Sequence, residues 1–294
     1  MSTPLVRADT RADLQRALAP RTAGARVGFV PTMGALHEGH ASLIRRAREE
    51  VGPDGSVVVS VFVNPTQFGP GEDLERYPRT LEADLGACAA AGADVVFTPS
   101  VEEMYPAGLD GGVTVAPGPL GSVLEGAARP GHFAGVLTVV AKLFGLVRPH
   151  VAVFGEKDYQ QLALIRRMVA DLCLGIEVVG GETVREPDGL AMSSRNRYLD
   201  TDERVAALGL SRALFAARGA AGRGAERALG AARAELRRTR LVDVDYLEIA
   251  APDLDPTPDQ GPARMLVAAR VGTTRLIDNV ALDLGVSAGS TTGE

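Results

Sequence analysis

The segment 27–40 reads VGFVPTMGALHEGH, and it decides how the rest of the chain is interpreted. A short apolar run is followed by Pro31 and Gly34, then by the pattern His-x-Gly-His, and then by an amphipathic run. This order predicts a strand that leads into the start of a helix, where backbone N–H groups favour anions. An imidazole there can donate to a phosphate oxygen, and Gly39 lets a ligand approach the backbone closely. Two surface histidines on a polar loop are the alternative, but the flanking glycines favour a nucleotide site.

The composition limits the classes of protein to which the chain can belong. The chain has 294 residues, of which 46% are hydrophobic, and a formal net charge of −6, which suits one large domain or two ordinary ones. The mild acidity argues against nucleic acid as a partner, and the apolar runs are too short to span a membrane. The first residues lack a signal-peptide pattern, and Cys88 and Cys173 lie in helix-like apolar patterns that suit reduced packing residues. We therefore expect a cytoplasmic protein that binds neither nucleic acid nor membrane.

Up to about residue 183, apolar runs of strand length alternate with helical patterns. The runs are rich in β-branched residues, which is typical of a parallel sheet covered on both faces. We expect an α/β fold with a doubly wound, Rossmann-like parallel sheet, whose ligand lies beyond the carboxyl ends of the strands. The expected strands are 27–30, 57–63, 94–97, 151–154 and 176–179, and the expected helices are 40–51, 79–91, 133–147 and 158–174.

The pattern changes beyond residue 183. Helical patterns at 200–219 and 224–239 precede strand-like runs at 241–250, 265–271 and 274–280, an order that suggests a small α+β domain. We therefore expect three parts. A Rossmann-like domain over 1–183 binds the nucleotide and the second substrate, and a smaller α+β domain over 184–284 covers the active site. The last residues, 285–294, form a disordered tail.

Four segments carry side chains suited to chemistry, and three of them follow predicted strands. They are 33–40 (MGALHEGH), 62–68 (FVNPTQF), 155–161 (GEKDYQQ) and 189–196 (GLAMSSRN). Together they supply what adenylyl transfer requires, because cations and hydrogen-bond donors can offset the charge of a leaving pyrophosphate. The cationic and imidazole groups are Lys157, Arg195, His37 and His40, and the neutral donors are Ser193 and Ser194.

The lysines are informative because the chain uses arginine almost everywhere else. Lys142 and Lys157 are the only lysines among 31 basic residues. Lys142 lies in an apolar helical run, where its aliphatic stem can pack on apolar neighbours while its ammonium reaches water, so it requires no functional role. Lys157 follows a predicted strand, and we interpret it as functional because arginine does not reproduce a compact ammonium group.

Motifs of several competing classes are absent from the sequence. It contains no Gly-x-x-x-x-Gly-Lys-Ser/Thr phosphate loop, no Gly-x-Gly-x-x-Gly after a strand and no Gly-x-Ser-x-Gly elbow. These absences weaken the kinase, dehydrogenase and hydrolase interpretations. Two interpretations stay open at this point, which are a nucleotidyltransferase of the His-x-Gly-His type and a nucleotide-binding module without catalysis.

Six blocks of sequence, in the same order, resemble the pantothenate synthetase (pantoate–β-alanine ligase) family of the His-x-Gly-His nucleotidyltransferase superfamily. His-x-Gly-His alone is shared by many nucleotidyltransferases, whereas the ordered set is specific and spans nearly all of 28–199. The blocks are PTMGxLHxGH from Pro31, FVNPTQF from Phe62, YPRT from Tyr77, RPGHF from Arg129, FGEKDYQQ from Phe154 and RExDGLAMSSRN from Arg185.

The resemblance implies a two-step reaction in pantothenate and coenzyme A biosynthesis. The carboxylate of pantoate attacks the α-phosphorus of ATP, which gives pantoyl adenylate and pyrophosphate. The amine of β-alanine then attacks the activated acyl carbon and releases pantothenate and AMP. The resemblance also implies ATP as a substrate, a requirement for Mg²⁺ and a homodimer.

The resemblance also implies roles for individual residues. Gln67 and Gln161 hold pantoate, which suits a nucleophile because an amide donates hydrogen bonds without fully neutralising the carboxylate. His132 either caps a helix or lies near the pantoate pocket, and the two interpretations stay open together. The implied catalytic residues are His37, His40, Lys157 and Arg195. The implied ATP-binding residues are Pro31, Met33, Gly34, His37, Gly39, His40, Gly155, Lys157, Asp158, Val184, Met192, Ser193, Ser194 and Arg195. The implied pantoate and β-alanine residues are Gln67, Gln161, Asn64, Arg129 and His132, and the implied metal ligand is Asp84, with Glu82 as a further candidate.

Overall fold

The computed structural model describes residues 4–19 and 24–285, and the chain divides into two compact units. The first unit contains Met1–Glu156 and Gln161–Glu182, and the second contains Lys157–Gln160 and Thr183–Glu294. The short segment 157–160 therefore belongs with the second unit, although it lies within the first predicted domain. The expected disordered tail lies outside the described residues, apart from residue 285.

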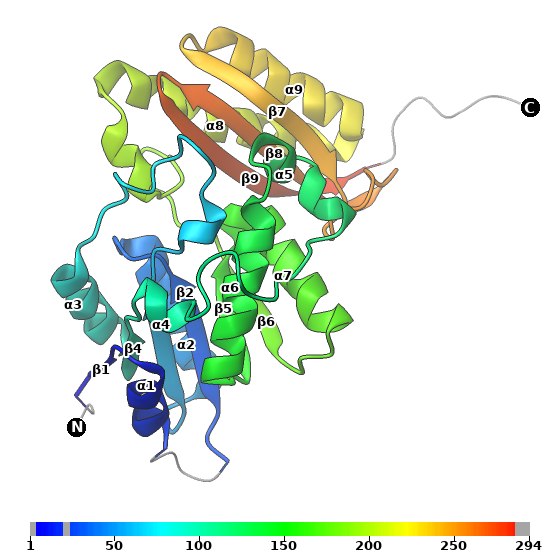
Figure 1. Ribbon diagram of the computed structural model, residues 1–294. Helices are drawn as coiled ribbons and strands as arrows, with labels where there is room; N and C mark the ends of the chain where they lie inside the picture. Colours follow the sequence, from blue (N-terminus) through cyan, green and yellow to red (C-terminus); the bar gives the residue numbers. More distant parts are fainter. Residues whose placement is uncertain (1–3, 20–23, 286–294) are drawn as a thin grey trace, which may run out of the picture. The chain divides into compact units, whose positions relative to one another are not determined.

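The first unit is built on a six-stranded parallel sheet in the order β1-β4-β3-β2-β5-β6 (Figure 1). The predicted α/β doubly wound fold is confirmed, although β1 and α1 were not among the predicted elements. The strands are β1 (Val6–Ala8), β2 (Val27–Thr32), β3 (Ser56–Val61), β4 (Val95–Phe97), β5 (Val151–Gly155) and β6 (Glu177–Gly181). The α-helices of this part of the chain are α1 (Arg11–Leu18), α2 (Glu38–Val51), α3 (Leu81–Ala91), α4 (Val101–Met104), α5 (Glu125–Ala128), α6 (His132–Val147) and α7 (Tyr159–Asp171).

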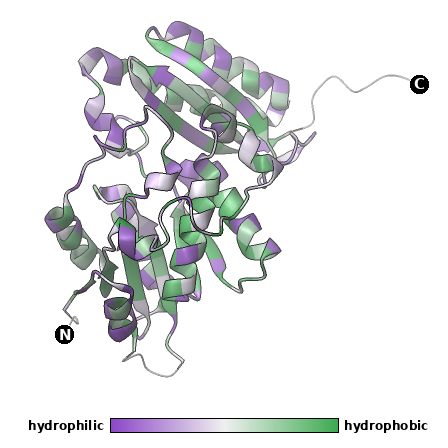
Figure 2. Cartoon of the chain, viewed as in Figure 1, coloured by the Kyte–Doolittle hydropathy of each residue, from purple (hydrophilic) through white to green (hydrophobic). Residues whose placement is uncertain are grey.

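Apolar side chains hold helices to both faces of this sheet. On one face, Ile44 and Ala47 of α2 join a buried cluster with β-branched residues of β2, β3 and β5. On the other face, the Phe144 ring of α6 packs edge-on against Phe29 of β2 and Phe154 of β5, with ring centroids 6.3 Å apart in each pair. Figure 2 shows α6 mostly in hydrophobic colours, as expected for a helix with buried residues along its length.

The strand order reverses between β2 and β5. From β2 the chain continues to β3 and β4 on one side, whereas β5 and β6 extend the sheet on the other side. The pairing of β2 with β3 continues to Thr32 and Val61, but its pairing with β5 ends at Phe29 and Ala152. The carboxyl ends of β2 and β5 therefore part from each other, and such a switch point is where open α/β sheets bind ligands.

The second unit is a small α+β structure, as predicted. Its sheet has the antiparallel order β7-β8-β9, and α8 and α9 pack on it through buried residues such as Leu210, Leu214 and Met265. The elements are α8 (Thr201–Ala220), α9 (Ala225–Arg238), β7 (Val242–Ala250), β8 (Gly261–Val271) and β9 (Thr274–Leu284).

The two cysteines differ from each other in the structure. Cys88 is buried in α3 and Cys173 is exposed beyond the end of α7, and both thiols are free. The interpretation of Cys173 as a packing residue is therefore wrong, because α7 ends at Asp171 and its apolar pattern does not extend to this position. Within the described ranges, none of the helices combines the length and the apolar character needed to cross a membrane.

Candidate active site

The loop that leaves β2 is held by a buried carboxylate from α3. Gly34 and Ala35 both have positive φ, +84° and +52°, and for a residue with a side chain this conformation costs about 1–2 kcal/mol. The backbone N–H groups of Ala35 and Leu36 donate to the two oxygens of Asp84 at 3.0 and 2.8 Å. The hydroxyl of Thr80 donates to the same carboxylate at 3.2 Å. These charge-assisted hydrogen bonds offset the strain of the loop and fix its shape.

The same contacts bear on the predicted role of Asp84 as a magnesium ligand. Asp84 is 2% exposed, and both of its oxygens already accept hydrogen bonds from the loop. In the part of the chain that the structure describes, no group of three or more His, Cys, Asp or Glu residues could hold a metal ion. The carboxylate therefore does not fit a metal ligand and instead supports the loop, a role that no sequence pattern predicted.

The two predicted catalytic histidines lie together at the start of α2. His37 is the N-cap residue of this 14-residue helix. Its backbone N–H donates to Nδ1 of His40 at 3.3 Å, and the two ring centroids are 4.1 Å apart. Because Nδ1 accepts, the proton of a neutral His40 lies on Nε2, which suits donation to an anionic oxygen. The N-terminus of the helix favours a phosphate group at the same place.

Gln67 is held at the carboxyl end of β3 by the neighbouring amide of Asn64. Nδ2 of Asn64 donates to Oε1 of Gln67 at 3.1 Å and to the carbonyl oxygen of Gly135 at 3.3 Å, while its Oδ1 accepts from the Tyr105 hydroxyl at 2.8 Å. The amide of Asn64 is thus occupied by protein contacts, which suits a positioning role. Nε2 of Gln67 donates to Sδ of Met33 at 3.0 Å, and a thioether is a weak acceptor that a substrate carboxylate could replace.

Arg129 and His132 act on the backbone of Gln67. Nδ1 of His132 lies 2.8 Å from the carbonyl oxygen of Gln67, and Arg129 donates to the same oxygen at 3.3 Å. Arg129 is itself held by Glu72 through two parallel hydrogen bonds of 2.7 and 2.6 Å. Burial alone would raise the pKa of Glu72, but the hydrogen bond and the charge of Arg129 outweigh it and keep the pKa below its usual value.

The environment of His132 keeps its imidazole neutral. Burial is the main cause that lowers the pKa of His132 to about 4, and the charge of Arg129 adds to it. Nδ1 therefore carries the proton donated to Gln67, and Nε2 accepts from Arg129 at 3.0 Å. The helix-cap interpretation of His132 is wrong, because Gly131 is the N-cap of α6 and His132 is its first residue. The ring instead holds the backbone beside the predicted pantoate residue.

In the second unit, the segment before Ser193 forms a tight hairpin. The Met192 N–H donates to the Val184 carbonyl at 2.9 Å, and Arg185 and Ala191 form an antiparallel bridge. Ser193 caps the short 3-10 helix Ser194–Tyr198 by accepting from the Arg195 N–H at 3.2 Å. The Ser193 and Arg195 positions are therefore fixed by local backbone structure.

The predicted site residues divide between the two units. In the first unit, Gly155 ends β5, and Gln161 lies in the first turn of α7. Lys157 belongs to the second unit, and its ammonium lies 3.6 Å from the Asp158 carboxylate. The residues of the first unit are Pro31, Met33, Gly34, His37, Gly39, His40, Asn64, Gln67, Asp84, Arg129, His132, Gly155 and Gln161, and those of the second are Lys157, Asp158, Val184, Met192, Ser193, Ser194 and Arg195.

Sequence reasoning missed several residues that support these positions. Glu72 lies in a loop without a motif, and nothing in the sequence links it to Arg129. Asp278 and Asn279 interrupt the apolar alternation of β9, a signal that could have identified them as more than strand residues. The other lysine, Lys142, has its ammonium 5.1 Å from the Tyr105 ring centroid, which accounts for it without a catalytic role.

The fold and these residues define a Rossmann-like nucleotide-binding enzyme, with imidazoles, amides and a lysine following the carboxyl ends of parallel strands. A family model described as pantoate-beta-alanine ligase matches residues 7–281. The chain therefore belongs to the pantoate-beta-alanine ligase family.

Individual relatives agree with this assignment. The chain is 67% identical to a pantothenate synthetase of Nocardioides sp., with 97% of this chain and 87% of the relative covered. It is 61% identical to a pantothenate synthetase of Mycolicibacterium smegmatis, with 92% and 84% covered.

Solved structures show the same similarity. The pantothenate synthetase of Thermus thermophilus is 51% identical, with a TM-score of 0.87 and 94% of this chain and 99% of that chain covered. The pantoate-beta-alanine ligase of Francisella tularensis is 34% identical, with a TM-score of 0.77 and 94% and 97% covered, and its crystal structure is a complex with beta-gamma ATP and beta-alanine.

Proposed function

We propose that this chain condenses pantoate with β-alanine at the expense of ATP. In the first step a carboxylate oxygen of pantoate bonds to the α-phosphorus of ATP, and the bond to the leaving pyrophosphate breaks. In the second step the β-alanine amine attacks the acyl carbon of pantoyl adenylate, loses a proton and displaces AMP. Membership in the ligase family supports this reaction, and so does the Francisella tularensis complex with beta-gamma ATP and beta-alanine.

One observation carries the assignment of the pantoate residues. The Gln67 amide N–H donates to a methionine sulfur, although its own oxygen is held firmly by Asn64. A carboxylate is a much stronger acceptor than a thioether, so pantoate gains a hydrogen bond at a group that is already oriented. Since the amide is neutral, the bound carboxylate keeps its charge and stays nucleophilic. We assign Gln161 the same role, and Asn64, Arg129 and His132 the role of positioning Gln67.

The nucleotide is assigned to the remaining predicted residues. His40 donates from Nε2 to a phosphate oxygen, and His37, Lys157 and Arg195 offset the charge that develops on pyrophosphate. Positioning and electrostatics suffice for such a transfer, and no covalent nucleophile is required. The other residues of the ATP assignment are Pro31, Met33, Gly34, Gly39, Gly155, Asp158, Val184, Met192, Ser193 and Ser194.

Three finer properties are also proposed, of which Mg²⁺ and the homodimer rest on the family resemblance and the location rests on the sequence composition. We propose that Mg²⁺ accompanies ATP, without Asp84 as a ligand, and that activity is lost when EDTA exceeds the added Mg²⁺. We further propose a homodimer, which sedimentation velocity at micromolar concentration tests directly. The cytoplasm is the proposed location, and cell fractionation followed by immunoblotting tests it.

The reaction itself is tested with purified protein, pantoate, β-alanine, ATP and Mg²⁺. We expect one AMP for each pantothenate, and an exchange of pyrophosphate into ATP that requires pantoate but not β-alanine. Exchange that requires a phosphorylated acceptor instead of pantoate would identify another nucleotidyltransferase. Nucleotide binding without AMP formation would leave only a binding module and would overturn the proposal.

A further inference from the structure

Two adjacent polar residues are buried in the middle of the apolar strand β9. Asp278 and Asn279 are 5% and 4% exposed, and their neighbours Leu276 and Val280 belong to the core of the second unit. Burying a carboxylate and an amide is unfavourable unless both are fully hydrogen-bonded. The partners of this pair therefore show what the two residues hold in place.

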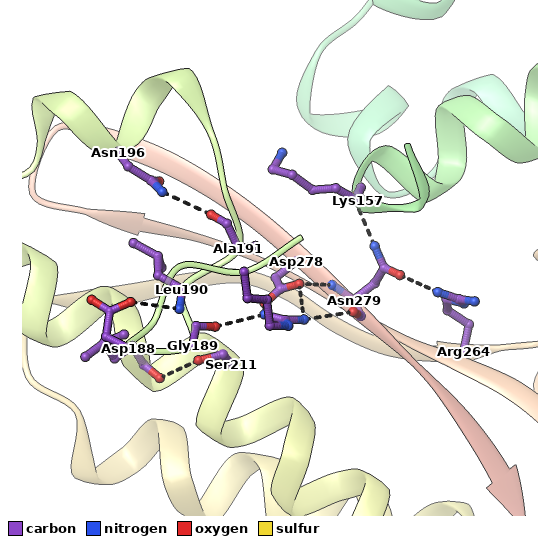
Figure 3. Close-up of polar contacts among 12 residues, drawn as sticks. Lys157, Asp188, Gly189, Leu190, Ala191, Asn196, Ser211, Arg264, Asp278 and Asn279 are labelled. Atoms are coloured by element: carbon purple, nitrogen blue, oxygen red, sulfur yellow. Dashed lines mark hydrogen bonds and ion pairs between the residues drawn. The ribbon is translucent and has the colours of Figure 1, made fainter. Parts of the chain in front are cut away.

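Asn279 holds the backbone of Lys157 (Figure 3). Its Nδ2 donates to the Lys157 carbonyl oxygen at 2.9 Å, and its Oδ1 accepts from Nη1 of Arg264 at 2.7 Å. The guanidinium of Arg264 lies 3.9 Å from the ring centroid of Tyr159, and the Tyr159 hydroxyl donates to the Pro252 carbonyl at 2.8 Å. These contacts tie the segment that follows β5 to the second unit at three points.

Asp278 holds the other nucleotide segment. Arg185 donates to its two oxygens at 2.7 and 2.9 Å, and the Asn279 N–H donates to the same carboxylate at 2.7 Å. Nη1 of Arg185 also donates to the Gly189 carbonyl at 3.1 Å, across the hairpin that Arg185 forms with Ala191. The carboxylate thus fixes the hairpin from which the chain continues to Ser193.

We propose that Asp278 and Asn279 are positioning residues that fix the two cationic segments of the second unit relative to each other. Asn279 holds the segment of Lys157, and Asp278 holds the hairpin before Ser193–Arg195. Cations stabilise a transferring phosphoryl group only when they are held in the productive geometry, so a small displacement of either segment weakens the first step. This inference rests on the proposed function, in which Lys157 and Arg195 contact ATP.

Nearly isosteric variants separate the two contacts. Asn279→Asp keeps an oxygen for Arg264 but removes the N–H donor to Lys157, and Asp278→Asn removes the charge that orients Arg185. Asp245→Asn is the control matched to Asp278→Asn, because it makes the same chemical change at the ion pair of Asp245 with Arg275 in the same sheet, 2.6 Å between Nε and Oδ2. Two rates are measured on every preparation, which are pantoate-dependent exchange of pyrophosphate into ATP and the reaction of chemically prepared pantoyl adenylate with β-alanine.

We expect the exchange rate of both junction variants to fall 10-fold to 100-fold, with a raised KM for ATP. The reaction of preformed adenylate should stay within 3-fold of the unmodified chain, and Asp245→Asn should change neither rate. Because both rates are measured on one preparation, their ratio does not depend on the fraction of folded protein. A ratio of the exchange rate to the adenylate rate that stays the same as in the unmodified chain, whether both rates fall equally or neither falls, would overturn the positioning role. Absence of both activities from the unmodified chain would instead overturn the proposed function.

Discussion

Replacing His132 by Asn should remove a pH-dependent part of the stability of the first unit. The variant keeps a donor close to the place of Nδ1 and so can keep the hydrogen bond to Gln67, but it carries no titratable group. In the unmodified chain the pKa of His132 is lowered from 6.5 to about 4 by burial and by Arg129. Between these values the folded protein keeps the ring neutral, whereas the unfolded chain takes up a proton.

The sign and size of the effect follow from this difference. The unfolded state binds more protons between pH 6.5 and 4, so the free energy of unfolding falls as the pH is lowered through this window. A pKa lowered from 6.5 to about 4 corresponds to about 3 kcal/mol when the pH has reached 4, and to about 2 kcal/mol at pH 5. The carboxylates titrate in the unmodified chain and in the variant alike, so the difference between the two isolates the histidine.

Two measurements test the reasoning. Urea unfolding at pH 7 and pH 5 should show that the unmodified chain loses about 2 kcal/mol relative to His132→Asn. The chain has four histidines, so carbon-13 NMR can follow each ring separately and the variant identifies the His132 signal. That signal should remain neutral down to pH 5. A His132 signal with a midpoint near 6.5, or a stability difference that does not change with pH, would refute the reasoning.

Four other substitutions test the site and the residues that support it. Asp84→Asn should lower the free energy of unfolding by about 2 kcal/mol, because one N–H of the loop after β2 loses its acceptor; urea unfolding measures it, with the exposed Glu82→Gln as the control. Gln67→Ala and Gln161→Ala should raise the KM for pantoate much more than the KM for ATP, and unchanged pantoate kinetics in both would contradict their assignment. Gly135→Ala should also raise the pantoate KM, since a Cβ there would collide with the backbone carbonyl of Thr66 beside Gln67; initial-rate kinetics that stay unchanged would show that the helix and the loop adjust.

Local patterns predicted most of the fold because strands and helices are encoded by short-range periodicity. The β-branched runs identified β2, β3, β5 and β6 with small errors at their ends, and the helix-then-strand order identified the second unit. β1 was missed because it has only three residues and pairs only with β4. The start of α1 had a readable signal, since Thr10 and Asp13 form a capping box.

The supporting contacts were harder to predict because they join residues far apart in the chain. Asn279 and Lys157 are separated by 122 positions, and Glu72 and Arg129 by 57. No periodic pattern relates such positions. The segments that carry the chemistry could be recognised from their own residues, whereas the side chains that orient them became visible only with the tertiary structure. Asp84 illustrates the difference, because the family resemblance implied a metal ligand and its contacts assign it to a loop.

Pro31 shows how one residue links the sequence to the site. A proline inside a central strand usually argues against that strand, because it removes a hydrogen-bond donor from the ladder. β2 nevertheless tolerates Pro31, because its pairing with β5 has already ended at Phe29 while its pairing with β3 continues to Thr32. The N–H and C=O groups of one strand residue point to the same side, and those of its neighbour point to the opposite side. The Phe62 N–H donates to the Thr32 carbonyl on the β3 side. An N–H at position 31 would therefore point toward β5, and this is the donor that Pro31 lacks. The proline therefore stands where the two strands part, and it prevents the ladder from closing the switch point at which the nucleotide is proposed to bind.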